Sequence, residues 1–159
     1  VLCGHSERRW VIGEDDAFIN KKMHAALDHD IQPILCVGEQ LAEREANRTG
    51  VVVEAQVRAG LAGIAADRAR DVTVAYEPVW AIGTGLTAST AQAGEVHAMI
   101  RELLGEIWGD AGQGVRILYG GSVKAQNAGE LMGTPDINGV LVGGASLKAD
   151  SFAAIVKAA

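Results

Sequence analysis

The chain has 159 residues, of which 48% are hydrophobic and 21% are charged, a balance that is typical of a folded domain and excludes general disorder. Its formal net charge of −6 gives it no general attraction to nucleic acid or to anionic lipid. No apolar run approaches the ~20 residues that span a bilayer, so we expect neither a nucleic-acid partner nor a membrane segment.

Short apolar runs recur along the chain, at residues 1–4, 33–38, 72–78, 115–121 and 139–144. Each run is continuously apolar rather than alternating, which is typical of strands buried on both faces of a parallel sheet. The two cysteines, Cys3 and Cys36, lie inside the first two runs, so we expect buried, inert thiols. Two cysteines are too few for a disulfide framework, which favours a reducing compartment.

Helical patterns lie between these runs, at residues 16–29, 40–48, 51–64, 89–108, 125–132 and 150–158, with a break near Thr49–Gly50. The first is expected to place Phe18, Met23, Ala26 and Leu27 on one face. The clearest is 89–108, where Ser89 and Gln92 form a plausible capping box. An apolar stripe follows at helical spacing, made of Val96, Met99, Ile100, Leu103, Leu104 and Ile107.

Strands and helices therefore alternate, which predicts an α/β protein with repeated βαβ units and a parallel sheet in one domain, residues 1–159. The periodicity alone leaves two architectures open, a doubly wound open sheet and a (β/α) barrel. Neither a G-x-G-x-x-G segment nor a Walker A motif follows a strand, which disfavours nucleotide binding. Both architectures bind ligands at the carboxyl ends of their strands.

Glu77 ends the third apolar run, in AYEPVWAIGTG, where a barrel would keep catalytic groups. Partial burial there would raise its pKa and make it a better base, although a strand-end glutamate paired with an arginine is the equal alternative. The segment after it is apolar between a stiff proline and two glycines, as in a lid that closes over a ligand, or else in a loop packed permanently on the barrel. The predicted lid consists of Pro78, Val79, Trp80, Ala81, Ile82, Gly83, Thr84 and Gly85.

His5 follows the first run, in GHSERR, at the same strand-end position as Glu77. Ser6 would cap a helix or turn, and nearby backbone N–H groups would keep the imidazole neutral and able to donate to a carbonyl oxygen. Glu7, Arg8 and Arg9 could equally form a surface salt-bridge cluster. The other three histidines fall in helical stretches, and none makes a metal-ligand spacing with another.

Two glycine-rich turns follow the last two runs, YGGS at 119–122 and VGGAS at 142–146. Each is followed by a helical pattern, so their backbone N–H groups suit a phosphate, and a phosphate site after the last two strands recurs in barrels. Tight turns without a ligand are the alternative.

Taken together, GHSERR at 4–9, PILCVGE at 33–39, AYEPVWAIGTG at 75–85, ILYGGSV at 117–123 and GVLVGGASL at 139–147 resemble the triosephosphate isomerase family in order and spacing, over essentially the whole chain. The resemblance implies a (β/α)8 TIM barrel that interconverts dihydroxyacetone phosphate and D-glyceraldehyde 3-phosphate, in glycolysis and gluconeogenesis. It implies a homodimer in the cytoplasm, with no metal and no organic cofactor.

The resemblance also assigns roles to residues. Glu77 would move the proton between two substrate carbons, and His5 would be the neutral electrophile at the carbonyl. Glu7 would help to organise the site beside His5. Backbone N–H groups would bind the substrate phosphate at Gly83, Ser122, Gly143 and Gly144.

The chain also departs from the family. A full barrel has eight strands and ~250 residues, whereas five strands are expected here, matching the family's strands 4 to 8 without strands 1 to 3. The family's Asn-x-Lys segment, whose lysine contacts the substrate, has no equivalent here, because Asn20-Lys21-Lys22 falls in a predicted helix. Leu86 stands where lysine often follows the lid. We therefore expect an incomplete barrel of about five βα units, an open C-shaped sheet, and no activity of this chain alone.

Two alternatives stay open beside the isomerase. Another phosphate-binding barrel enzyme, a lyase or synthase, would share the glycine-rich turns but would not need Glu77 beside a lid. A non-catalytic phosphate-binding module would keep its ligand affinity when Glu77 is replaced by glutamine.

Overall fold

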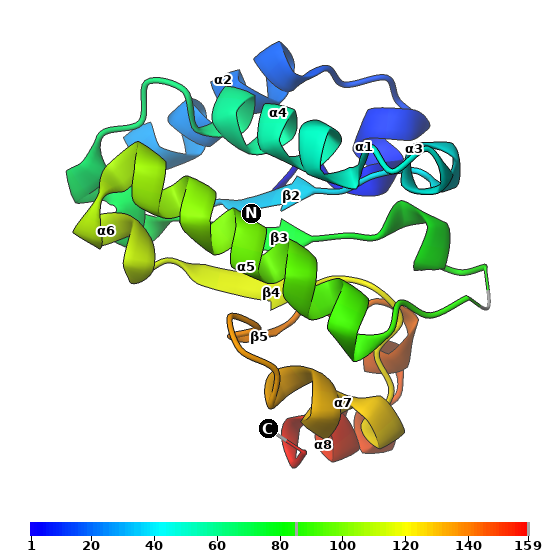
Figure 1. Cartoon of the computed structure of the whole chain (residues 1–159). Helices are drawn as coiled ribbons and strands as arrows, with labels where there is room; N and C mark the ends of the chain where they lie inside the picture. Colours follow the sequence, from blue (N-terminus) through cyan, green and yellow to red (C-terminus); the bar gives the residue numbers. More distant parts are fainter. Residues whose placement is uncertain (85, 159) are drawn as a thin grey trace.

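The structure is a computed structural model that describes residues 1–84 and 86–158. Its centre is a parallel sheet in the order β1-β2-β3-β4-β5, formed by Leu2–Cys3, Ile34–Val37, Thr73–Tyr76, Arg116–Tyr119 and Gly139–Val140. Each strand pairs with the next one in the chain, and β1 and β5 are the two edges of the sheet, which is therefore open (Figure 1). The parallel α/β fold predicted from the alternation of runs is confirmed.

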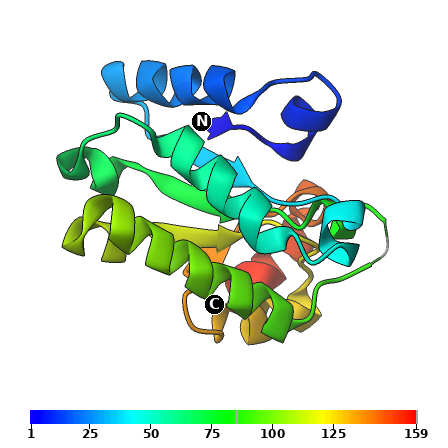
Figure 2. The same ribbon diagram turned by 45° about the horizontal axis from the view of Figure 1, so that its top comes forward.

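The helices follow the strands in turn. The α-helices are α1 (Ser6–Trp10), α2 (Asp16–Asp28), α3 (Leu41–Glu45), α4 (Thr49–Leu61), α5 (Thr90–Trp108), α6 (Asp110–Gln113), α7 (Ala125–Met132) and α8 (Ala149–Val156). Three 3₁₀ helices are η1 (Ala66–Asp71), η2 (Val79–Ala81) and η3 (Gly144–Leu147). Helix α2 packs against α4 and α4 against α5, and Figure 2 shows them side by side along the sheet.

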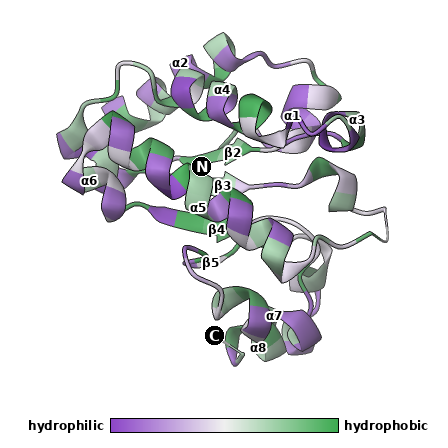
Figure 3. Cartoon of the chain, in the orientation of Figure 1, coloured by the Kyte–Doolittle hydropathy of each residue, from purple (hydrophilic) through white to green (hydrophobic). Residues whose placement is uncertain are grey.

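The core lies between this helical layer and one face of the sheet. Leu35, Val74 and Ile117 are neighbours in register on β2, β3 and β4, and all three are fully buried. Helices α4 and α5 carry both apolar and polar residues, as amphipathic helices on a core do (Figure 3). On the opposite face, Leu2 is exposed and Ile34 is half-buried, so this face is covered less at the β1 edge.

Several elements lie where the sequence predicts them. Helix α5 begins after Ser89, whose hydroxyl oxygen accepts the Gln92 N–H at 3.1 Å while the Gln92 side chain accepts the Ser89 N–H at 3.0 Å. This confirms the capping box. Helix α7 has the predicted bounds, and both thiols are buried and free, as expected.

Other expectations are wrong in detail. The break between the two pieces lies at residues 46–48, where Asn47 has φ 55°, and Thr49 and Gly50 belong to α4. Phe18 is 49% exposed on α2, and its neighbour Ile19 is buried instead. The expectation of strands buried on both faces holds for β3 but not for the short edge strands.

Within the described residues, no helix is both long enough and apolar enough to cross a membrane.

Candidate active site

His5 and Glu77 meet at the carboxyl ends of the strands. His5 lies between β1 and α1 as the N-cap of that helix, and Glu77 follows β3 directly. The His5 Nε2 atom lies 3.0 Å from Glu77 Oε1. The backbone N–H of Ser6, the first residue of α1, donates to Glu77 Oε2 at 2.9 Å. One short helix therefore holds both the imidazole and the carboxylate.

The His5 ring has a defined tautomer. Its Nδ1 accepts the backbone N–H of Glu7 at 3.4 Å, so the ring hydrogen of the neutral imidazole is on Nε2, which donates to Glu77. Glu7, which is expected to help organise the site beside His5, contacts the ring through its backbone N–H, and its side chain is exposed.

Glu77 is 2% exposed. Burial raises the pKa of this carboxyl above its ordinary value, and the His5 ring, the Ser6 N–H and the Arg9 guanidinium act in the opposite direction. A raised pKa makes a carboxylate a stronger base. Packing explains how it fits: a Cβ placed on Gly38, just after β2, would lie 1.7 Å from the Glu77 carbonyl oxygen. Only glycine allows the two strand ends to approach so closely.

A pocket of about 180 Å³ contains both functional groups. Its volume is below the ~300–1,000 Å³ of drug-sized sites, so it suits a small metabolite. It is walled by residues from β1 and from the segments after β3, β4 and β5, namely Leu2, His5, Glu77, Ile82, Gly120, Gly121, Leu141, Val142 and Gly143.

One of the four predicted phosphate-binding residues lines this pocket, and the other three are its neighbours in the sequence. Gly143 lines it. Ser122, Gly144 and Gly83 each lie one residue from a lining residue, and Gly144 begins η3, while Gly83 has φ 70° and is exposed.

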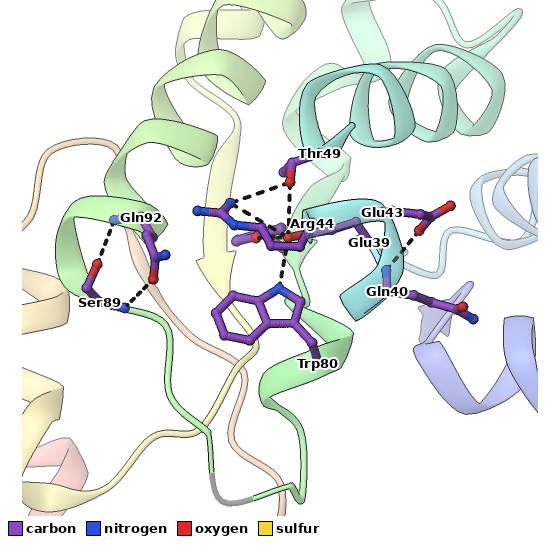
Figure 4. Close-up of polar contacts among 9 residues, drawn as sticks. Glu39, Gln40, Glu43, Arg44, Thr49, Trp80, Ser89 and Gln92 are labelled. Atoms are coloured by element: carbon purple, nitrogen blue, oxygen red, sulfur yellow. Dashed lines mark hydrogen bonds and ion pairs between the residues drawn. The ribbon is translucent and has the colours of Figure 1, made fainter. Parts of the chain in front are cut away.

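The predicted lid is described from Pro78 to Thr84, and Gly85 lies outside the described residues. The short helix η2 fills its first half, with Ala81 buried and Ile82 against the pocket. The Trp80 indole N–H donates to Glu39 Oε1 at 2.9 Å (Figure 4). The beginning of this segment is therefore anchored to the end of β2.

Glu39 is a residue that the sequence reasoning did not single out. It has no exposed surface, and both of its carboxylate oxygens accept from the Tyr76 hydroxyl at 3.1 Å. Arg44 lies 3.8 Å away as an ion-pair partner, and its guanidinium is 5.8 Å from the Trp80 ring centroid (Figure 4). Glu39, like Glu77, is a carboxylate that follows a buried strand, and this position is the signal in the sequence that could have identified it.

In residues 1–84 and 86–158, no three or more His, Cys, Asp or Glu side chains gather as metal ligands.

Comparison with known proteins identifies the family. A family model described as triosephosphate isomerase matches residues 1–159. The chain belongs to the triosephosphate isomerase family. The Moorella thermoacetica triosephosphate isomerase is 61% identical over 156 residues, which are 98% of this chain and 63% of that protein. The Rhodopirellula baltica triosephosphate isomerase is 56% identical over 160 residues, again 63% of its length.

A solved structure agrees with the fold. The crystal structure of triosephosphate isomerase from Bartonella henselae superposes with a TM-score of 0.90 at 43% identity. The match covers 99% of this chain and 63% of that one. This confirms that the open five-stranded sheet corresponds to part of a TIM barrel, and the chain spans 63% of the length of these relatives.

Proposed function

We propose that this site performs the isomerisation of triose phosphates, interconverting dihydroxyacetone phosphate and D-glyceraldehyde 3-phosphate. The observation that carries the proposal is the His5–Glu77 pair, 3.0 Å apart at the strand ends, in a chain of this family. In the family's chemistry, a glutamate base works beside a neutral imidazole.

The chemistry assigns a separate proton to each side chain. Glu77 removes a proton from the carbon next to the substrate carbonyl and returns it to the neighbouring carbon. The His5 Nε2–H, which faces Glu77 in the structure, donates instead to the carbonyl oxygen of the substrate and stabilises the charge of the enediolate. His5 passes this proton to the carbonyl oxygen and takes up the proton of the neighbouring hydroxyl group, so the ring is neutral again when the product has formed. Burial of Glu77 favours the first step because it raises the pKa of the base towards neutrality.

The rest of the site would bind and enclose the substrate. The backbone N–H groups of Gly83, Ser122, Gly143 and Gly144 are proposed to hold the phosphate. The lid, residues 78–85, would exclude water from the enediolate. Neither a metal nor an organic cofactor has a role in this proposal. A homodimer and a cytoplasmic location belong to the same proposal and rest on the resemblance.

A chimaera tests the proposal. Residues 1–159 replace the matching 63% of the Moorella thermoacetica enzyme, and turnover of D-glyceraldehyde 3-phosphate is measured. We expect an active enzyme in which Glu77→Gln lowers kcat by at least about 10²–10⁴-fold, the contribution of general acid–base catalysis. Retained turnover in the Glu77→Gln chimaera would refute the assignment of the base. Unchanged ligand affinity without turnover would favour a binding module.

The 159-residue chain alone is the second measurement. We expect no turnover above its own Glu77→Gln variant, because the pocket is open beside Leu2, which is 42% exposed at the β1 edge. Activity above that control would contradict this expectation.

A further inference from the structure

Arg9 is a buried cation to which the proposed mechanism assigns no function. It lies in the last turn of α1 and is 9% exposed. Its guanidinium makes four contacts within the molecule. Nε donates to the carbonyl oxygen of Gly4 at 2.9 Å, Nη2 donates to that of Cys36 at 3.0 Å, and Nε also contacts the Cys36 oxygen at 3.4 Å. Nη1 pairs with Asp16 Oδ1 at 2.5 Å.

The two carbonyl groups belong to the segments that carry the site. Gly4 immediately precedes His5, and Cys36 lies in β2, the strand between β1 and β3. The planar guanidinium is suited to this task because its donors are fixed in one plane and always charged. Arg9 therefore ties the segment that carries His5 to the neighbouring strand.

Gly4 shows how closely this contact is built. It has φ 77°, and an added Cβ would lie 3.0 Å from Arg9 Nη2, 3.1 Å from the Cys36 oxygen and 3.1 Å from Ile19 Cδ1. A side chain at this position would be strained and would displace the guanidinium. The guanidinium of Arg9 can therefore occupy this position only because Gly4 has no side chain.

We propose that Arg9 is the positioning residue of the His5–Glu77 pair: by bridging the Gly4 and Cys36 carbonyls, it sets where His5 and the amino end of α1 stand relative to Glu77. The Ser6 N–H and the His5 Nε2–H both reach Glu77 from this segment. A shift of α1 by a fraction of an ångström lengthens both hydrogen bonds at once. Arg9 also acts through its positive charge, which lowers the pKa of Glu77 and so favours the ionised carboxylate that accepts these hydrogen bonds.

This inference concerns the catalytic pair of the proposed isomerase, but its test needs no turnover. Nitrogen NMR of the His5 ring reports the tautomer, and carbon NMR of the Glu77 carboxyl reports its titration. Three variants of the chain are compared: Arg9→Gln, Arg9→Lys and the control Arg8→Gln. Arg8→Gln is a matched control because it also removes one arginine from α1. The Arg8 side chain pairs with Glu14 and not with the Gly4 and Cys36 carbonyl groups.

We expect Arg9→Gln to abolish the single Nε2–H tautomer signal of His5 and to raise the pKa of Glu77. Arg9→Lys keeps the charge without the planar bridge, so it should lose the tautomer signal while leaving the Glu77 titration closer to that of the parent chain. Arg8→Gln should change neither signal. If Arg9→Gln and Arg9→Lys both keep the His5 signal of the parent chain, the proposal is overturned, whatever they do to stability.

Asp16→Ala covers the case in which the Arg9 variants fail to fold, because it removes the Oδ1 acceptor of the guanidinium and leaves Arg9 in place. We expect a partial loss of the His5 tautomer signal in that folded variant. An unaltered signal there, with Arg9→Gln unfolded, would also overturn the proposal. Failure of the chimaera to isomerise triose phosphates would refute the proposed function and leave these NMR results unaffected.

Discussion

We expect the fold to lose stability in mild acid because His97 is buried in its neutral form. It lies on α5 with no exposed surface. Its Nδ1 lies 3.1 Å from the Asp136 carbonyl oxygen, which can only accept, so Nδ1 carries the hydrogen. Among the described residues, Nε2 is buried without a hydrogen-bond partner, and the rings of Tyr76 and Tyr119 have their centroids 6.0 and 6.3 Å away. A proton on Nε2 would therefore be a buried, unpaired charge.

The magnitude follows from linkage. Burial lowers the pKa of His97 from 6.5 to about 4, and the Arg101 guanidinium acts in the same direction, while the Asp136 carbonyl opposes it. The unfolded chain binds this proton more tightly than the folded chain does. The free energy of unfolding is therefore highest, as far as His97 is concerned, above pH 6.5, and it falls as the pH falls towards 4. Each pH unit costs about 1.4 kcal/mol, so the whole interval costs about 3 kcal/mol, a large part of the ~5–15 kcal/mol of a typical domain.

Urea unfolding measures this difference. The parent chain and His97→Asn are compared from about pH 7.5 to about pH 4. Asparagine keeps an N–H in the position of Nδ1 but does not titrate. It should lower the unfolding free energy at neutral pH by about 1–3 kcal/mol, through the cavity it leaves. The difference in unfolding free energy between the two chains should then change by about 3 kcal/mol in favour of His97→Asn at the acid end, which closes or reverses it. His24→Asn, which also removes a histidine beside a backbone carbonyl, is the control. A gap that stays constant with pH would refute the reasoning.

Three further outcomes are expected. Trp80→Phe removes a hydrogen bond to the buried Glu39 carboxylate and should lower the unfolding free energy by about 1.5–3 kcal/mol in urea, and an unchanged urea midpoint would contradict the anchor. Gly38→Ala should prevent native folding, judged by near-ultraviolet circular dichroism, because the added Cβ overlaps backbone, whereas Gly114→Ala, whose Cβ meets its nearest neighbour at 3.7 Å, should fold. The Cys36 thiol, whose pKa burial raises, should react with a disulfide reagent only as fast as the chain unfolds, and rapid labelling of the native chain would show otherwise.

The elements that the sequence predicts well are those that local interactions specify. Helix α5 has a capping box at Ser89 and an apolar stripe, and both signals act within a few residues of one another. The short helices α1, η2 and η3 carry too few residues for a period to be recognised, and tertiary contacts decide them. The misplaced break before α4 had a readable signal, since Asn47 adopts φ 55° and asparagine tolerates that conformation better than most residues.

The candidate site divides in the same way. The positions of Glu77 and His5 could be recognised because a charged or polar residue at the end of an apolar run is conspicuous in the sequence. Arg8 and Arg9 look alike there, and a surface salt-bridge cluster describes Arg8, which pairs with Glu14, but not Arg9. The difference is that Arg9 binds two backbone carbonyl groups. Every residue has a backbone carbonyl group, so the sequence does not indicate which of them will bind an arginine.

The consequence is that the His5–Glu77 pair, which we propose to be catalytic, depends on β2, a strand that contributes neither residue. Gly38, at the end of β2, lets the Glu77 backbone approach, and the Cys36 carbonyl in the same strand holds Arg9. His5 and Glu77 lie in the segments that follow β1 and β3, two strands that do not pair with each other. Their separation is therefore set through the strand between them, so a substitution in β2 that shifts its backbone is expected to alter the His5–Glu77 distance without touching either side chain.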